Sequence, residues 1–170
     1  IFNFVGSGAT TGRGITDERA HAGGFLYIDN TTVEKNVQSN LFVGPTGGGV
    51  NVFVNNSRFL GSTANSGAAI RGGSKASITK SSFSGNLNFG IVVEADTAGT
   101  FAAIDSCVIT NNGTGVVTTT NSPTAQIANN LISGNGTGVQ NFSGTLRSTN
   151  NRIDGNTTNV SGILSGYNVQ

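Results

Sequence analysis

Chemically active side chains are most concentrated in residues 13–21, which read RGITDERAH. Within this stretch Asp17, Glu18 and His21 could bind a metal ion or serve as an acid and a base. The alternative is an exposed loop or a short helix that covers one end of the fold, with opposite charges paired along it. We expect the covering role, because the rest of the chain is a repeat and terminal repeats are usually polar and atypical.

Two further candidates lie in the middle of the chain. Glu94, Asp96 and Asp105 could offer carboxylate oxygens to Ca²⁺, but their spacing matches no calcium-binding loop, so we expect solvated charges at a turn. Cys107 is the only cysteine, which excludes an intrachain disulfide. The only histidine, His21, lies far from Cys107 in the sequence, and we therefore expect a structural cysteine.

A catalytic site for carbohydrate chemistry would need two positioned titratable groups. No pair of Asp or Glu shares the phase of an arginine in neighbouring repeats, and no face gathers arginine with acidic residues. The arginines compared are Arg58, Arg71, Arg147 and Arg152. We therefore predict no catalytic residues, no metal site and no cofactor, and the ligand-binding residues stay open.

The composition is polar but almost uncharged. Gly, Asn, Thr and Ser make up about half of the 170 residues, charged residues are 10% and the formal net charge is +1. Disordered chains usually combine high net charge with few aromatic residues, whereas this chain has 10 Phe. No Lys/Arg run suggests a nucleic-acid partner, and no apolar run is long enough for a membrane-spanning helix. These features predict a β-rich fold with many turns.

One phrase recurs, since ASITKSSFSGN at residues 76–86 and AQIANNLISGN at residues 125–135 place apolar, small polar and Asn residues alike. Aligning the copies gives three columns. The first contains Ile28, Val54, Ile78, Ile104, Ile127 and Ser148. The second contains Val33, Phe59, Phe83, Ile109, Ile132 and Ile153. The third contains Asn36, Ser62, Asn86, Asn112, Asn135 and Asn156.

Each copy holds about three short strand-like segments separated by Gly, Asn and Ser, with no room for a helix. A segment of roughly 24 residues can circle a narrow core once and return one strand spacing further along. We therefore predict an all-β parallel β-helix, a solenoid of about six coils in which each column is buried by its copies above and below. The alternative is a β-sandwich, which does not require one residue type at a fixed phase.

The repeat divides a single domain, residues 1–170, into three parts. We expect an irregular N-terminal coil or cap at residues 1–24, regular coils at residues 25–163 and a terminal strand at residues 164–170. Both ends are strand-like, so we expect end-to-end self-association or coverage by other chains, unless the chain is part of a longer solenoid.

The columns resemble the right-handed parallel β-helix repeat of the pectate-lyase-like superfamily over residues 25–163. Residues 67–70 (GAAI) and 83–86 (FSGN) are also similar to the G-G-A-I and F-x-x-N phrases of polymorphic outer-membrane-protein repeats. The resemblance implies a right-handed coil, a secreted or cell-surface protein, and an association with polysaccharides or adhesion. Catalytic motifs of polygalacturonase-like and alginate-epimerase-like members, such as Gly-His-Gly and Asp-Pro-His, do not occur in this sequence.

These observations favour a non-catalytic extracellular β-helix that acts as a surface scaffold, an adhesin or a self-assembling fibre unit. The alternatives are a polysaccharide-active lyase, hydrolase or epimerase, or a fragment of one, and a carbohydrate- or ice-binding module. Exposed stacking aromatic residues would favour sugar binding, although the chain has no Trp and only Tyr27 and Tyr167 as tyrosines. Ranked threonines would favour ice binding, but the run Thr118–Thr120 is not repeated in neighbouring coils. We interpret the N-x-S/T sequons as part of the Asn-rich turns.

Overall fold

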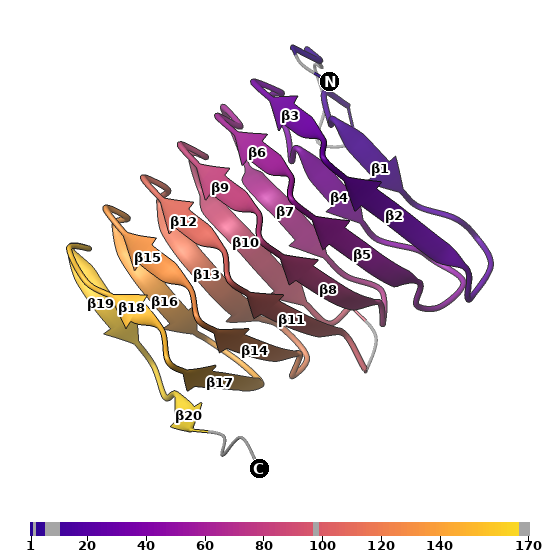
Figure 1. Ribbon diagram of the computed structural model, residues 1–170. Coiled ribbons are helices and arrows are strands. Elements are labelled where there is room, and N and C mark those ends of the chain that lie inside the picture. The colour runs from indigo at the N-terminus through magenta and orange to yellow at the C-terminus, as the bar shows by residue number, and fades with distance from the viewer. Residues whose placement is uncertain (2, 6–10, 97–98, 167–170) are drawn as a thin grey trace.

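The structure, a computed structural model, describes residues 1, 3–5, 11–96 and 99–166. This part of the chain forms β-strands that line up in three parallel sheets along one elongated body (Figure 1). Neighbouring strands in a sheet come from successive coils of the chain. Among the described residues, no helix is long and apolar enough to cross a bilayer.

Three strands, one for each sheet, make up a coil. Sheet 1 contains β1 (Ile15–Asp17), β4 (Leu41–Val43), β7 (Ser66–Ile70), β10 (Phe89–Glu94), β13 (Thr114–Thr119), β16 (Thr137–Asn141) and β19 (Thr158–Ser161). Sheet 2 contains β2 (Phe25–Asp29), β5 (Asn51–Asn55), β8 (Lys75–Thr79), β11 (Phe101–Asp105), β14 (Thr124–Ala128), β17 (Thr145–Thr149) and β20 (Ser165–Gly166). Sheet 3 contains β3 (Thr32–Glu34), β6 (Arg58–Leu60), β9 (Ser82–Ser84), β12 (Val108–Thr110), β15 (Leu131–Ser133) and β18 (Arg152–Ile153).

The arrangement confirms the predicted all-β solenoid of about six coils with roughly 24 residues in each. Within the stretch 1–24, for which an irregular coil or cap is the prediction, β1 already lies in sheet 1 and pairs in register with β4. At the other end β20 covers only part of the predicted terminal strand. Residues 167–170, which include Tyr167, lie outside the described residues.

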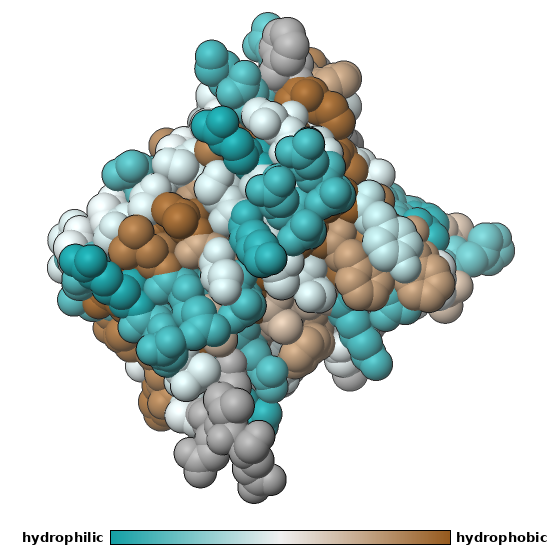
Figure 2. All heavy atoms as spheres, in the orientation of Figure 1, coloured by the Kyte–Doolittle hydropathy of each residue, from teal (hydrophilic) through white to brown (hydrophobic). Residues whose placement is uncertain are grey.

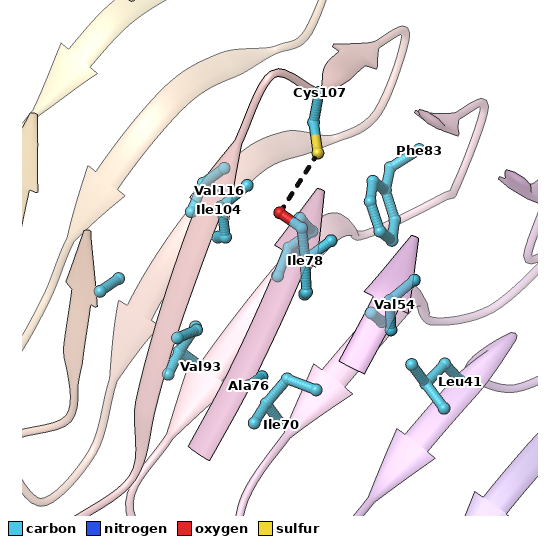
Figure 3. Packing of buried hydrophobic residues seen from close by; sticks show 14 of the residues in the cluster. Leu41, Val54, Ile70, Ala76, Ile78, Phe83, Val93, Ile104, Cys107 and Val116 are labelled. Atoms are coloured by element: carbon cyan, nitrogen blue, oxygen red, sulfur yellow. Dashed lines mark hydrogen bonds between the residues drawn. The ribbon is translucent and has the colours of Figure 1, made fainter. Parts of the chain in front are cut away.

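The core consists of side chains that stack on their counterparts in the next coil. The rings of Phe59 and Phe83 lie 5.0 Å apart between centroids, with 9° between their planes. Val33, Ile109 and Ile132 continue this column and are fully buried. Figure 3 shows Phe83 among buried side chains from several coils, all directed into the space between the sheets. Each such burial contributes about 1.5–3 kcal/mol, and only stacked coils can achieve it.

Sheets 2 and 3 are joined in every coil by a two-residue bend. Its first residue has a left-handed conformation, with φ between 44° and 55°, at Asn30, Asn56, Lys80, Ser106, Asn129 and Asn150. Asn tolerates this conformation better than most residues, which accounts for part of the Asn content. The second residue links the coils, as when the Asn130 backbone N–H donates to Asn151 Oδ1 at 2.9 Å.

The Asn column forms a buried ladder, which we call the Asn ladder. Asn86 donates both its backbone N–H and its Nδ2 to Asn112 Oδ1, at 3.0 and 2.9 Å. Asn112 repeats this pattern on Asn135 at 2.9 and 3.0 Å. Asn112 Nδ2 also donates to the carbonyl oxygen of Phe83 at 3.0 Å. These buried amides are therefore paired, as buried polar groups need to be.

The second coil continues the Asn ladder by a matched exchange of two residues. In other coils a glycine precedes the buried residues of the sheet 1 strand and lies against the Asn ladder. Gly67 is an example, because a Cβ on it would lie only 2.8 Å from Asn86 Nδ2. In the second coil Asn40 takes this glycine position, and Ser62 takes the ladder position and leaves space for it. Asn40 Oδ1 accepts from Asn36 Nδ2 at 2.8 Å, and Asn40 Nδ2 donates to Asn86 Oδ1 at 3.1 Å.

This exchange predicts strong coupling between positions 40 and 62. We expect Asn40→Gly to lower the free energy of unfolding by about 2–4 kcal/mol, because buried amides at Asn36 and Asn86 lose a partner. Ser62→Asn alone is also expected to destabilise, since its amide would overlap that of Asn40. The double variant restores the pattern of the other coils and should recover most of the loss. Chemical denaturation of the four proteins measures the coupling, and simply additive losses would contradict it.

Candidate functional site

An aromatic surface is exposed on the outer face of sheet 2. In β2 the sequence FLYID directs Ile28 into the core and leaves Phe25 and Tyr27 outside. In β5 Phe53 lies opposite Tyr27. The exposed fractions of Phe25, Tyr27 and Phe53 are 59%, 69% and 40%. We call these three residues the aromatic ladder.

The rings of the aromatic ladder stack on one another. Tyr27 and Phe53 lie 5.0 Å apart between ring centroids with 11° between planes, and Phe25 and Tyr27 lie 5.9 Å apart with 21°. Figure 2 shows apolar surface over the region of β2 and β5, next to polar surface on the same face. Contiguous exposed apolar area on a folded domain often marks a binding site. The aromatic ladder is therefore the leading candidate site.

A row of polar side chains runs beside the aromatic ladder on the same face. Asn55 Nδ2 donates to Asp29 Oδ1 at 2.8 Å, and Thr79 Oγ1 donates to Asn55 Oδ1 at 3.0 Å. These bonds join three neighbouring strands and hold the side chains in place. The face thus combines stacked rings with positioned hydrogen-bonding groups, which is the usual division between affinity and orientation in a ligand site.

A hollow of about 230 Å³ adjoins the aromatic ladder at the start of the sheet 2 strands. Its lining residues are Gly49, Val50, Asn51, Gly73 and Lys75. Asn51 pairs in register with Phe25, and Lys75 pairs with Asn51. The hollow therefore begins on β5, the strand that carries Phe53, and extends one strand further to β8.

A second group of side chains, the charged cluster, lies on sheet 1 and comprises Arg13, Phe42, Arg71 and Glu94. The Arg13 guanidinium lies 3.5 Å from the Phe42 ring centroid, and that of Arg71 lies 5.3 Å from it. Arg71 Nε forms an ion pair with Glu94 Oε2. Arg13 extends the cluster through an ion pair with Glu18 at 2.7 Å. A cation above an aromatic face is favourable, so Arg13 and Arg71 both stabilise the position of Phe42 on sheet 1.

The Arg71–Glu94 pair corrects one prediction from the sequence. No face was expected to gather arginine with acidic residues, yet Arg71 and Glu94 follow Ile70 and Val93, which are register partners. Burial raises the pKa of Glu94, the positive charge of Arg71 opposes this effect, and the negative charge of Asp96 adds to it. The outcome is one half-buried carboxyl with a raised pKa rather than a matched catalytic pair.

The two carboxylates singled out in 13–21 are held in separate ion pairs. Asp17 accepts from Arg19 at 2.6 Å, and this hydrogen bond lowers the pKa of Asp17 despite its burial. Glu18 pairs with Arg13 instead, and His21 is exposed. Among the described residues, no three His, Cys, Asp or Glu side chains gather as a metal site would require.

The other carboxylate candidates are also separated. Asp105 lies on sheet 2, where it accepts from Ser106 Oγ at 2.9 Å and from Asn129 Nδ2 at 2.7 Å. Glu94 lies on sheet 1. The structure therefore brings only Glu94 and Asp96 close enough for an electrostatic effect.

Two further motifs have structural positions. Thr118 is fully buried and donates to Asn141 Oδ1 at 2.7 Å, so the Thr run does not form a flat exposed face. The sequon residues Asn112 and Asn135 belong to the buried Asn ladder, as the interpretation of these motifs as turn chemistry implies.

Cys107 lies in the small polar column of the bend between sheets 2 and 3. Its Sγ lies 3.2 Å from the Asp105 carbonyl oxygen and 3.7 Å from that of Ile78, the contact drawn in Figure 3. Its backbone N–H donates to Asn130 Oδ1 at 2.8 Å. Burial raises the pKa of the Cys107 thiol to about 11.

These observations define a parallel β-helix protein that exposes the aromatic ladder on the outer face of sheet 2. The chain belongs to the right-handed β-helix family, because the family model described as "Right handed beta helix region" matches residues 3–158. The search of curated proteins finds no match to the chain, and neither does the search of solved structures. The family match confirms the right-handed fold that the resemblance implies, and the likeness to pectate-lyase-like members is consistent with it.

The electrostatics of Glu94 give a testable order of pKa values. We expect Arg71→Met to raise the pKa of Glu94 further and Asp96→Asn to lower it, because these changes remove a favourable and an unfavourable charge. Titration of the Glu carboxyl carbons by NMR measures both shifts. The pKa of Glu94 is higher in the folded protein than in the unfolded chain. Such a group contributes its full stabilisation at pH values below the unfolded-state pKa, and this stabilisation is lost as pH rises through the folded-state pKa. Glu94→Gln should therefore gain stability over the wild type as pH rises through this range, and shifts in the reverse order would refute the assignment.

The burial of Cys107 predicts an unreactive thiol. Because its pKa is about 11, the thiolate is scarce near neutral pH, and a disulfide reagent should label the native protein only as fast as it unfolds. Cys107→Ser should change the free energy of unfolding by less than about 1 kcal/mol, since Ser57 and Ser81 occupy the same position in other coils. Rapid labelling in native buffer would contradict the structural role.

Proposed function

We propose that this chain is a non-catalytic extracellular or cell-surface β-helix that binds glycans through the aromatic ladder and thereby acts as an adhesive module. The observation that carries the proposal is the exposed stack of Phe25, Tyr27 and Phe53. An aromatic face carries partial negative charge, and the axial C–H groups of a sugar ring are weakly positive and apolar. A pyranose can therefore stack on a ring face at the end of the aromatic ladder that no neighbouring ring covers.

The polar row gives the orientation that stacking alone lacks. Asp29, Asn55 and Thr79 form a chain of hydrogen bonds beside the rings and present donors and acceptors to sugar hydroxyls. Binding requires little rearrangement, because the stacked rings and the bonded row are already ordered. This preorganisation supports recognition of a sugar over non-specific adsorption of an apolar group.

The aromatic ladder predicts a specific loss of glycan affinity on truncation. We expect Tyr27→Ala and Phe53→Ala each to weaken binding by about tenfold or more, because exposed aromatic anchors carry most of the energy of such contacts. Affinity electrophoresis against soluble polysaccharides screens for binding, and calorimetry measures the dissociation constant. Phe142→Ala is the matched control, since Phe142 is 68% exposed and lies outside the aromatic ladder.

Two results would overturn this proposal. One is that the wild type binds no polysaccharide in the screen. The other is that Phe142→Ala weakens binding as much as Tyr27→Ala does, which would indicate non-specific hydrophobic adsorption. Far-UV circular dichroism of each variant checks that the β-helix is intact.

Polysaccharide cleavage is the second candidate function, and the raised pKa of Glu94 supports it. A carboxyl that stays protonated nearer to neutral pH can act as a general acid. Release of reducing ends from a polysaccharide, abolished in Glu94→Gln, would favour an enzyme. Binding without product favours the adhesive module. End-to-end self-association stays a prediction, which electron microscopy across a concentration series would check.

A further inference from the structure

The hollow beside the aromatic ladder carries an inference that rests on the proposed function and specifies its ligand. We propose that the glycan bears an anionic substituent, and that the hollow at Lys75 receives this group while the sugar ring stacks on the aromatic ladder. The hollow has a volume of about 230 Å³, which is ample for a carboxylate or a sulfate together with water.

The shape of the hollow follows from the lengths of successive turns. The turn before β5 spans residues 44–50, whereas the turn before β8 spans only residues 71–74. The surface therefore steps inward at the third coil. A Cβ at Gly49 would collide with the Gly73 carbonyl group, so only glycine permits this close approach of the two coils. The backbone N–H groups of Val50, Asn51, Gly73 and Lys75 already donate hydrogen bonds within the protein, so the side chains of the hollow have to supply the donors for a polar guest.

The charge of the hollow comes from a single side chain. Lys75 is exposed and positively charged. The other lining residues are uncharged, and they are Gly49, Val50, Asn51 and Gly73. Within the described residues Lys75 forms no ion pair. Its ammonium group can therefore make a charge-assisted hydrogen bond to an incoming anion, and Asn51 Nδ2 lies on the neighbouring strand.

The negative charges of the same face lie away from the hollow. Lys75 is the first residue of β8, whereas Asp29 and Asp105 are the last residues of β2 and β11. Both carboxylates are also hydrogen-bonded to asparagine side chains, Asp29 to Asn55 and Asp105 to Asn129. An anion in the hollow therefore meets the cation first.

Register places the hollow within reach of a sugar bound to the rings. Phe25, Asn51 and Lys75 are successive partners across β2, β5 and β8. Two strand spacings, about 10 Å, separate the backbone of Phe25 from that of Lys75. A short stretch of glycan can span this distance, so one ligand can use both features at once.

Matched pairs of polymers test the inference. Carboxymethyl cellulose is compared with neutral hydroxyethyl cellulose, and dextran sulfate with dextran, by affinity electrophoresis and calorimetry at low salt. We expect the wild type to bind at least one anionic member about tenfold more tightly than its neutral counterpart, with a preference that falls as salt screens the charge. Lys75→Met should abolish the preference and retain binding to the neutral polymer.

Two variants separate the hollow from other effects. Lys80→Asn removes an exposed positive charge in the same coil and installs the residue found at this bend in other coils, so it should keep the preference. Tyr27→Ala should weaken binding to both members of a pair. A preference for carboxymethyl cellulose identifies the substituent as a carboxylate, and a preference for dextran sulfate identifies it as a sulfate.

The outcomes distinguish the inference from the proposed function. Equal binding of neutral and anionic polymers by the wild type overturns the inference and leaves glycan binding in place. A preference that survives in Lys75→Met, or that Lys80→Asn removes equally, also overturns it, because the cause would then be the general charge of the protein. If the wild type binds none of the four polymers, the proposed function fails together with the inference.

Discussion

The buried Asn ladder is the interaction on which the rest of the structure depends. Asn112 Oδ1 accepts from both the backbone N–H and the Nδ2 of Asn86, which ties one coil to the next residue by residue. In a strand with one buried face, a slip of one residue would exchange the inner and outer side chains. Phe53 would then enter the core and Val54 would leave it. The aromatic ladder is therefore a surface feature that the Asn ladder holds in register.

The coils are not equally constrained on every side. Two residues join sheets 2 and 3 in each coil, from 30–31 in the first to 150–151 in the sixth. The turns between sheets 1 and 2 vary instead, as the difference between residues 44–50 and 71–74 shows. Extra loop residues cost little free energy where no ladder has to be kept in register. The hollow at Lys75 lies on this variable side, so a ligand site can form there without disturbing the core.

The inward columns could be predicted from the sequence because each side chain has to pack against a copy of itself one coil away. That requirement repeats residue types at a fixed phase, as Ile78 and Ile104 do. Outward positions obey no such rule, so no repeated residue type marks the pair of Tyr27 and Phe53, although the column that aligns Ile28 with Val54 already sets these two residues opposite each other. The Arg71–Glu94 pair was missed for a related reason. The acidic residues near Glu94 in the sequence suggest a turn with solvated charges, whereas its ion-pair partner Arg71 comes from the neighbouring coil.

The outer columns also limit what the surface can bind. Beyond Phe53 the column of the aromatic ladder continues with Ser77, Ala103 and Gln126, so the stacked rings end after the second coil. A glycan that followed the whole long axis would soon leave the aromatic surface, whereas a short stretch that crosses β2, β5 and β8 can contact the rings and reach the hollow. Recognition is therefore local to the first three coils. If the chain has the adhesive role proposed above, the remaining coils supply the rigid length along which such a site is presented.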